Sequence, residues 1–199
     1  MRPFARRSFV AALTVGAVVT VAQVGFSGDE PPPPSPADMM KKMAEASALG
    51  KHHAELGARL GAWDVDIEVM GMPSKGSCEC TWLMEGRFLQ ERLKGSMMGA
   101  PMETVSIQGW DNVKKKFTYV ALNSMETAIR TAEGVVVDPT GKVQVSYGTL
   151  DEYLTGEHDK PVKYVHRTLG PDKRVLEVWD LGIGETGQVV VKFTYTRKK

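Results

Sequence analysis

The chain has 199 residues, which is enough for one folded domain with additional segments. Apolar residues make up 42% and charged residues 25%, a composition that is ordinary for a globular protein and excludes disorder throughout the chain. The 25 basic residues balance the 24 acidic ones, which excludes a nucleic-acid-binding protein that works through a large positive charge. Two cysteines exclude a small domain held together by several disulfides.

The first 24 residues have the pattern of an export signal. Arg2, Arg6 and Arg7 precede the apolar stretch 8–24, and the small residues at 20–22 offer a cleavage site. The paired arginines also fit the twin-arginine export pattern. The sequence therefore predicts an exported protein, periplasmic or extracellular, that carries a signal peptide at 1–24. An uncleaved membrane anchor is the alternative interpretation of the same segment.

A proline-rich spacer and a helical lead-in follow the signal. The spacer, residues 25–37, contains four consecutive prolines, which favour an extended chain. The lead-in, residues 38–60, repeats apolar side chains at steps of three and four, as a helix does. Gly50 weakens a continuous helix, so one long helix and two short ones remain alternatives. Met39 and Met43 on the apolar face are predicted to pack over the core.

From residue 61 to residue 199 the apolar residues recur with a period of two, which is typical of β-strands. No helix-length segment interrupts these strands, so neighbours are expected to pair antiparallel. The fold class is therefore all-β, an antiparallel up-and-down β-barrel of about ten strands with a short N-terminal helical lead-in. The expected strands are Trp63–Met70, Gly76–Glu85, Arg87–Lys94, Glu103–Asp111, Lys115–Leu122, Ala128–Val137, Lys142–Asp151, Val162–Thr168, Arg174–Leu181 and Gln188–Arg197.

The alternation also predicts which side chains face the interior. Each strand has one apolar face, which fits a single curved sheet around a core. In the strand at 142–151, the apolar face consists of Val143, Val145 and Tyr147, so these side chains are expected inside. Gln144 and Ser146 alternate with them and are expected on the wetted face.

Gly61 and Trp63 form a Gly-x-Trp motif at the start of the first strand, and Arg197 is a basic residue on the last one. These two ends of the strand region resemble the calycin signature, which is shared by lipocalins and fatty-acid-binding proteins. Because a closed barrel pairs its first and last strands, the resemblance implies that the Arg197 guanidinium lies across the Trp63 indole. Such a cation–π contact contributes about 0.5–2 kcal/mol.

Five longer motifs follow one another along the chain, at 53–63, 83–89, 97–103, 109–117 and 195–197. In this order they resemble a bacterial family described as domain-of-unknown-function family 1579. This resemblance implies a calycin-like barrel and leaves the activity open. Where the family pattern is expected to have an aromatic residue and, two residues later, an acid, this chain has Ala121 and Asn123.

Two residue types invite a metal or haem interpretation. Cys78 and Cys80 lie two apart on one strand, about 6.7 Å along it, which is too far for a disulfide without a break in the strand. No histidine stands at a recognisable zinc spacing from them, so they are predicted to be buried core thiols, with a metal site and an exposed redox pair as the alternatives. The calycin resemblance implies that His166 is the candidate axial ligand of a haem, with a hydrogen-bonded strand histidine as the alternative.

These observations predict an exported protein that binds a small apolar or amphipathic ligand in the barrel interior. An enzyme using the same cavity, a haem-binding barrel and a packed structural or interaction barrel are the alternatives. The sequence predicts no catalytic residues, no metal, no cofactor and no nucleic-acid partner, and a membrane contact only through an uncleaved signal. The side chains expected to bind the ligand are Trp82, Tyr119, Tyr147, Tyr164, His166 and Phe193.

Overall fold

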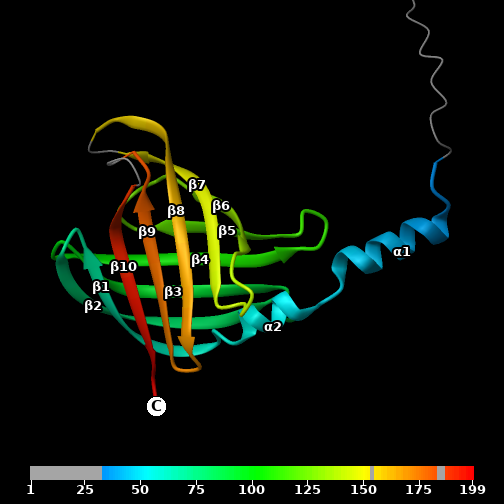
Figure 1. Cartoon of the computed structure of the whole chain (residues 1–199), viewed down its shortest axis with the longest axis horizontal. Helices are drawn as coiled ribbons and strands as arrows, with labels where there is room; N and C mark the ends of the chain where they lie inside the picture. The colour runs from blue at the N-terminus through cyan, green and yellow to red at the C-terminus, as the bar shows by residue number, and fades with distance from the viewer. Residues whose placement is uncertain (1–32, 153–154, 183–186) are drawn as a thin grey trace, which may run out of the picture. The chain divides into compact units, whose positions relative to one another are not determined.

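The computed structural model describes residues 33–152, 155–182 and 187–199. The predicted export signal, residues 1–24, and most of the predicted spacer lie outside these ranges. The described part of the chain contains two helices followed by ten strands (Figure 1). Neither of these helices is long and apolar enough to cross a membrane.

The ten strands form one closed barrel in which each strand pairs antiparallel with its neighbours in sequence, and β1 closes the ring by pairing with β10. This order confirms the predicted up-and-down barrel of ten strands. The strands are β1 (Gly61–Val69), β2 (Met72–Leu83), β3 (Phe88–Met97), β4 (Ala100–Asp111), β5 (Lys116–Asn123), β6 (Arg130–Val136), β7 (Val143–Glu152), β8 (Glu157–Gly170), β9 (Lys173–Asp180) and β10 (Gln188–Arg197).

Two hairpins turn more tightly than the sequence suggested. Pro73 and Pro101 fall between the expected strands, but the structure places them inside β2 and β4. The β1–β2 turn consists of Met70 and Gly71, which have φ angles of 47° and 82°. Positive φ at both central residues is the geometry of the two-residue turn that matches the twist of paired strands.

The lead-in forms two short helices, α1 (Pro36–Ser47) and α2 (Lys51–Gly57), which decides between the two alternatives. Helix α2 packs against β3 and β4, and its Leu56 side chain is fully buried. Helix α1 has no buried residue, and Met39 and Met43 are 46% and 67% exposed. The prediction that these methionines pack over the core is therefore wrong, because the chain leaves the helical path before Gly50 and only α2 continues onto the barrel.

A hydrophobic core lines the inside of β1 and extends to the facing strands. Trp63, Val65, Ile67 and Val69 are each less than 8% exposed, while the residues between them carry charge and face out. Burying such side chains contributes about 1.5–3 kcal/mol each. The interior is not apolar throughout, however, because charged and amide side chains from other strands are also buried.

Candidate functional site

A buried ion pair joins Arg174 on β9 to Glu91 on β3. Arg174 Nη1 lies 3.0 Å from Glu91 Oε1, and each side chain is 6% exposed. The guanidinium carbon of Arg174 also lies 3.7 Å from the centre of the Tyr195 ring. Burial disfavours the charged form of Arg174, but the Glu91 carboxylate together with Tyr195 and the two cysteines outweighs burial and raises the pKa of Arg174 above its ordinary value. The pair thus keeps both charges inside the barrel.

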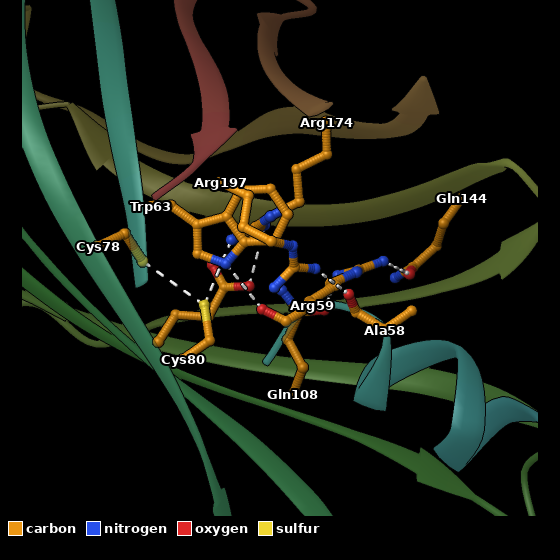
Figure 2. A network of polar contacts seen from close by, with 10 residues as sticks. Ala58, Arg59, Trp63, Cys78, Cys80, Gln108, Gln144, Arg174 and Arg197 are labelled. Atoms are coloured by element: carbon orange, nitrogen blue, oxygen red, sulfur yellow. Dashed lines mark hydrogen bonds and ion pairs between the residues drawn. The ribbon is translucent and has the colours of Figure 1, made fainter. Parts of the chain in front are cut away.

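A second arginine enters the barrel from the link between α2 and β1. Arg59 donates from Nη1 to Gln108 Oε1 at 2.7 Å and from Nη2 to Gln144 Oε1 at 3.0 Å (Figure 2). Burial and the positive charge of Arg174 lower the pKa of Arg59 to about 10. At neutral pH Arg59 is therefore charged, and two neutral amide oxygens hold it in place. We call Arg59, Glu91, Gln108, Gln144 and Arg174 the inner network.

A cavity of about 40 Å³ adjoins the inner network. A cavity needs roughly 10–15 Å³ for each water molecule, so this one has room for about three. Its apolar and polar side chains come from both sides of the barrel. The lining residues are Glu91, Leu93, Thr104, Ser106, Gln108, Tyr119, Leu176, Phe193 and Tyr195.

The structure places the predicted ligand-binding aromatics in three different surroundings. Tyr119 and Phe193 line the cavity, and the ring of buried Tyr164 lies 5.3 Å from that of Tyr119. Trp82 is partly buried and packs at the α2 end, where a side chain at Gly57 would meet its ring at 3.0 Å. The predicted ligand-binding residues therefore do not form one continuous surface.

Tyr147 is 58% exposed, so its predicted interior position is wrong. The inside of β7 is formed by Gln144 and Ser146, which are 5% and 2% exposed. Val143 and Val145 are on the other face, and both are only half-buried. The two faces of β7 are therefore reversed relative to the prediction, because the barrel interior is polar where β7 meets Arg59.

His166 is buried on β8, inside the barrel as predicted, and is 7% exposed. Burial, Arg59 and Arg174 lower the pKa of His166 well below its ordinary value, so the imidazole is neutral at pH 7. The cavity volume of about 40 Å³ argues against a haem at this histidine. Pockets for ligands of even drug size measure about 300–1,000 Å³. The residues around His166 therefore do not fit a haem in this conformation.

The barrel-closing residues meet as the calycin resemblance implies. Trp63 is the cross-strand partner of Arg197, and the Arg197 guanidinium lies 4.2 Å from the centre of the Trp63 ring. Arg197 also donates to the carbonyl oxygens of Ala58 and Pro171. At Gly61 the φ angle is +103°, and a side chain there would lie 3.2 Å from the Arg197 guanidinium. Arg197 thus connects β10 to the segment between α2 and β1, which contains Arg59.

Cys78 and Cys80 are buried free thiols that share one face of β2, as predicted. Their sulfur atoms lie 3.7 Å apart, and Arg174 Nη2 lies 3.4 Å from Cys80 Sγ. The hydrogen bond between the two thiols and burial raise the pKa of Cys78, so the Cys78 thiol is protonated at neutral pH. The two thiols and the Glu91 carboxylate are the donor groups within this site that could hold a metal ion.

Sequence reasoning missed the inner network. Arg59 lies in the predicted lead-in, and its two partners are 49 and 85 residues further along the chain. Glu91 and Arg174 are charged residues in strands, which the alternation rule assigns to either face without preference. A usable signal was the excess of polar residues at inward positions of β4 and β7, since Ser106, Gln108 and Gln144 need buried partners.

Residues 48–197 match the profile of the family described as Protein of unknown function (DUF1579). The chain belongs to this family. The match begins just before α2 and ends at Arg197, so in this DUF1579 protein it includes the whole inner network and the barrel closure. A search of curated proteins finds no match.

Two solved structures are similar to this DUF1579 protein. The crystal structure of Rv2717c from M. tuberculosis has a TM-score of 0.53 at 14% identity and covers 76% of this chain and 100% of its own. At this identity the similarity shows the fold alone. A redesigned β-barrel has a TM-score of 0.39 at 12% identity and covers 72% of this chain and 95% of its own.

Proposed function

We propose that this DUF1579 protein is an exported binding protein for a small amphipathic anion, which it holds inside the barrel near Arg59. The observation that carries the proposal is that Arg59 is charged and forms no ion pair with any acid of the described residues. A charge taken out of water is costly unless an opposite charge or several hydrogen bonds compensate it. A bound anion would supply that compensation.

The charge balance of the inner network supports an anionic ligand. The network contains two arginines and one carboxylate, Glu91, which is already paired with Arg174. His166 adds no charge because its pKa is lowered. The network therefore has a net charge of +1 in a region of low dielectric constant, where an anion is attracted more strongly than it is in water.

The cavity lining supports an amphipathic ligand. Gln108 accepts from Arg59 through its amide oxygen, which leaves its amide NH₂ group as a donor at the cavity wall. Leu93, Leu176 and Phe193 form an apolar part of the same wall. An acid group would lie at the Gln108 end and a short apolar group against the leucines. The volume of about 40 Å³ restricts the ligand to a few non-hydrogen atoms.

Export is part of the proposal and is supported by the basic and apolar pattern of residues 1–24. We expect the protein in the periplasm or outside the cell. Fractionation of cells followed by N-terminal sequencing tests this expectation. Cleavage near residues 20–22 supports a signal peptide, whereas an intact N-terminus in the membrane fraction supports an anchor.

A series of ligands with one acid group and increasing chain length tests the binding proposal. Formate and acetate are expected to raise the melting temperature, while butyrate, octanoate and the uncharged ethanol are expected to leave it unchanged. Arg59→Gln is expected to weaken binding of the best carboxylate about 10-fold, a loss of about 1.4 kcal/mol, because it removes the positive charge that lies next to Gln108 at the cavity wall.

The matched control is Arg92→Gln, which removes an arginine that pairs with Glu103 on the outer surface. This variant should bind carboxylates like the unaltered protein. If no carboxylate raises the melting temperature, or if ethanol raises it as much as acetate does, the proposed function is wrong.

A further inference from the structure

Three metal-ligating side chains meet inside the barrel, next to the cavity of the proposed ligand, and Glu91 is the one of them that also lines that cavity. Cys78 and Cys80 project from the inner face of β2, and Glu91 on β3 is the direct cross-strand partner of Cys80. All three are buried, at 3%, 2% and 5% exposure. The sulfur atoms of the two cysteines and a carboxylate oxygen of Glu91 lie within 4.8 Å of one another.

The spacing of the two sulfur atoms matches that of a tetrahedral zinc site. With Zn–S bonds of about 2.3 Å and tetrahedral angles, two thiolate ligands lie about 3.8 Å apart. The observed distance between Cys78 Sγ and Cys80 Sγ is 3.7 Å (Figure 2). Both residues lie within the continuous strand β2, so the backbone holds the sulfurs at this separation and opposes a disulfide between them.

The Glu91 carboxylate is placed to supply the third ligand. Its Oε1 atom is paired with Arg174 Nη1 at 3.0 Å but forms no hydrogen bond with the described residues. Zinc takes carboxylate oxygens of Asp and Glu as ligands, as well as thiolate sulfurs. Because a carboxylate has two oxygens and about four acceptor positions, Glu91 can coordinate a metal while it keeps its ion pair with Arg174.

The local charges balance with a divalent metal as well as without one. Two thiols, Glu91 and Arg174 have a net charge of zero. Binding of Zn²⁺ adds two positive charges and releases the two thiol protons to water, so the net charge stays zero. Arg174 Nη2, at 3.4 Å from Cys80 Sγ, is placed to donate to the thiolate and support it from outside the metal ligands.

We propose that Cys78, Cys80 and Glu91 form a zinc site inside the barrel. Three protein ligands leave one position of a tetrahedral ion open. Glu91 also lines the cavity of about 40 Å³, so a water molecule there would take the fourth position. The site is distinct from the contacts of Arg59, which lie on β4 and β7.

Titration of the reduced full chain with Co²⁺ as a spectroscopic substitute for Zn²⁺ tests the site. One equivalent is expected to give the near-ultraviolet absorption of thiolate-to-cobalt charge transfer, and Zn²⁺ should abolish it by displacement. In weak buffer, each Zn²⁺ should release about two protons, because ligand thiols must be deprotonated. Absence of the absorption at stoichiometric Co²⁺ would overturn the proposal without recourse to any variant.

Cys78→Ser and Cys80→Ser are expected to abolish the charge-transfer absorption, and Glu91→Gln to weaken Co²⁺ binding at least about tenfold. The matched control is Glu79→Gln, which alters the exposed carboxylate between the two cysteines on the opposite face of β2. Circular dichroism confirms that each variant is folded. Absorption that survives in both folded cysteine variants, or that is lost in Glu79→Gln, would contradict the site.

The outcome is separable from that of the proposed function. Arg59→Gln should keep the Co²⁺ absorption while losing carboxylate binding. Cys78→Ser should lose the Co²⁺ absorption while short carboxylates still raise its melting temperature. Failure of either test therefore leaves the other result interpretable.

Discussion

Strands β1 and β7 have the same alternating sequence pattern but present opposite faces to the interior. On β1 the apolar residues point inward and the charged residues point to water. On β7 the polar residues Gln144 and Ser146 point inward, while Tyr147 is on the outer surface. The difference shows that a period of two specifies a strand without specifying which face is buried.

The difference between the two strands arises from the side chains that each strand faces inside the barrel. β1 contributes to the hydrophobic core, so burial of apolar area decides its orientation. β7 faces the Arg59 guanidinium, which requires hydrogen-bond acceptors inside the barrel. Arg59 and the neighbouring Glu91–Arg174 ion pair therefore require polar side chains inside the barrel.

The largest effect is expected from breaking the buried ion pair. Glu91→Gln leaves the buried Arg174, beside the half-buried Arg59, without a carboxylate, so we expect a loss of about 3–5 kcal/mol in the free energy of unfolding. Urea denaturation at pH 7 measures it. Glu103→Gln is the control because it breaks the exposed Arg92–Glu103 pair and should cost no more than about 1 kcal/mol. Equal losses in the two variants would contradict a buried role for Glu91.

A smaller loss of stability is expected when an inward polar residue of β7 is replaced by an apolar one, as found on β1. Gln144→Leu places an apolar residue inward but removes an acceptor of the charged Arg59, so we expect a loss of about 1.5–3 kcal/mol in unfolding free energy. The outer-face variant Tyr147→Thr should change it by less than about 0.5 kcal/mol. If Gln144→Leu stabilises the protein, the polar face of β7 is not required by Arg59.

The buried tyrosines are expected to have the smallest effect on the free energy of unfolding at neutral pH. Above pH 10 their effect on it is expected to be large. Burial raises the pKa of Tyr119, Tyr164 and Tyr195 above the unfolded value of about 10. The folded state therefore holds more protons, and its stability is complete below pH 10 and falls as pH rises further. Arg59, with a pKa lowered to about 10, acts in the opposite direction but is a single group.

Urea denaturation at a series of pH values from 7 to 11, together with the phenolate absorbance of the native protein, measures this dependence. Tyr164→Phe should reduce the loss of stability above pH 10. Native phenolate absorbance from all three buried rings at pH 10, without loss of circular dichroism, would show that these tyrosines are not enclosed.

The sequence predicted the fold in detail and the site only in part. All ten strands and their antiparallel order follow from alternation and short turns. The Trp63–Arg197 contact was implied by the resemblance to the calycin signature, together with the need to close a ring. The shared face of Cys78 and Cys80 also follows, because side chains two apart on a strand point the same way. These features depend on local pattern or on topology, and both can be derived from one chain.

The inner network could not be derived in this way. Its contacts join residues that are far apart in sequence, and each partner alone has an unremarkable surface interpretation. Glu91 becomes a third donor to the cysteines only because the β2–β3 register sets it opposite Cys80. Helix α1 shows the converse error, since its apolar spacing predicted burial that no neighbouring surface provides.

The pairing of β1 with β10 has a consequence for how the chain is made. Trp63 cannot meet Arg197 until the last strand has been synthesised, so the ring stays open along two strand edges for most of translation. Contacts between such distant residues slow folding, and open edges invite pairing with other chains. A nascent or truncated chain that lacks β10 is therefore the form most in need of a chaperone.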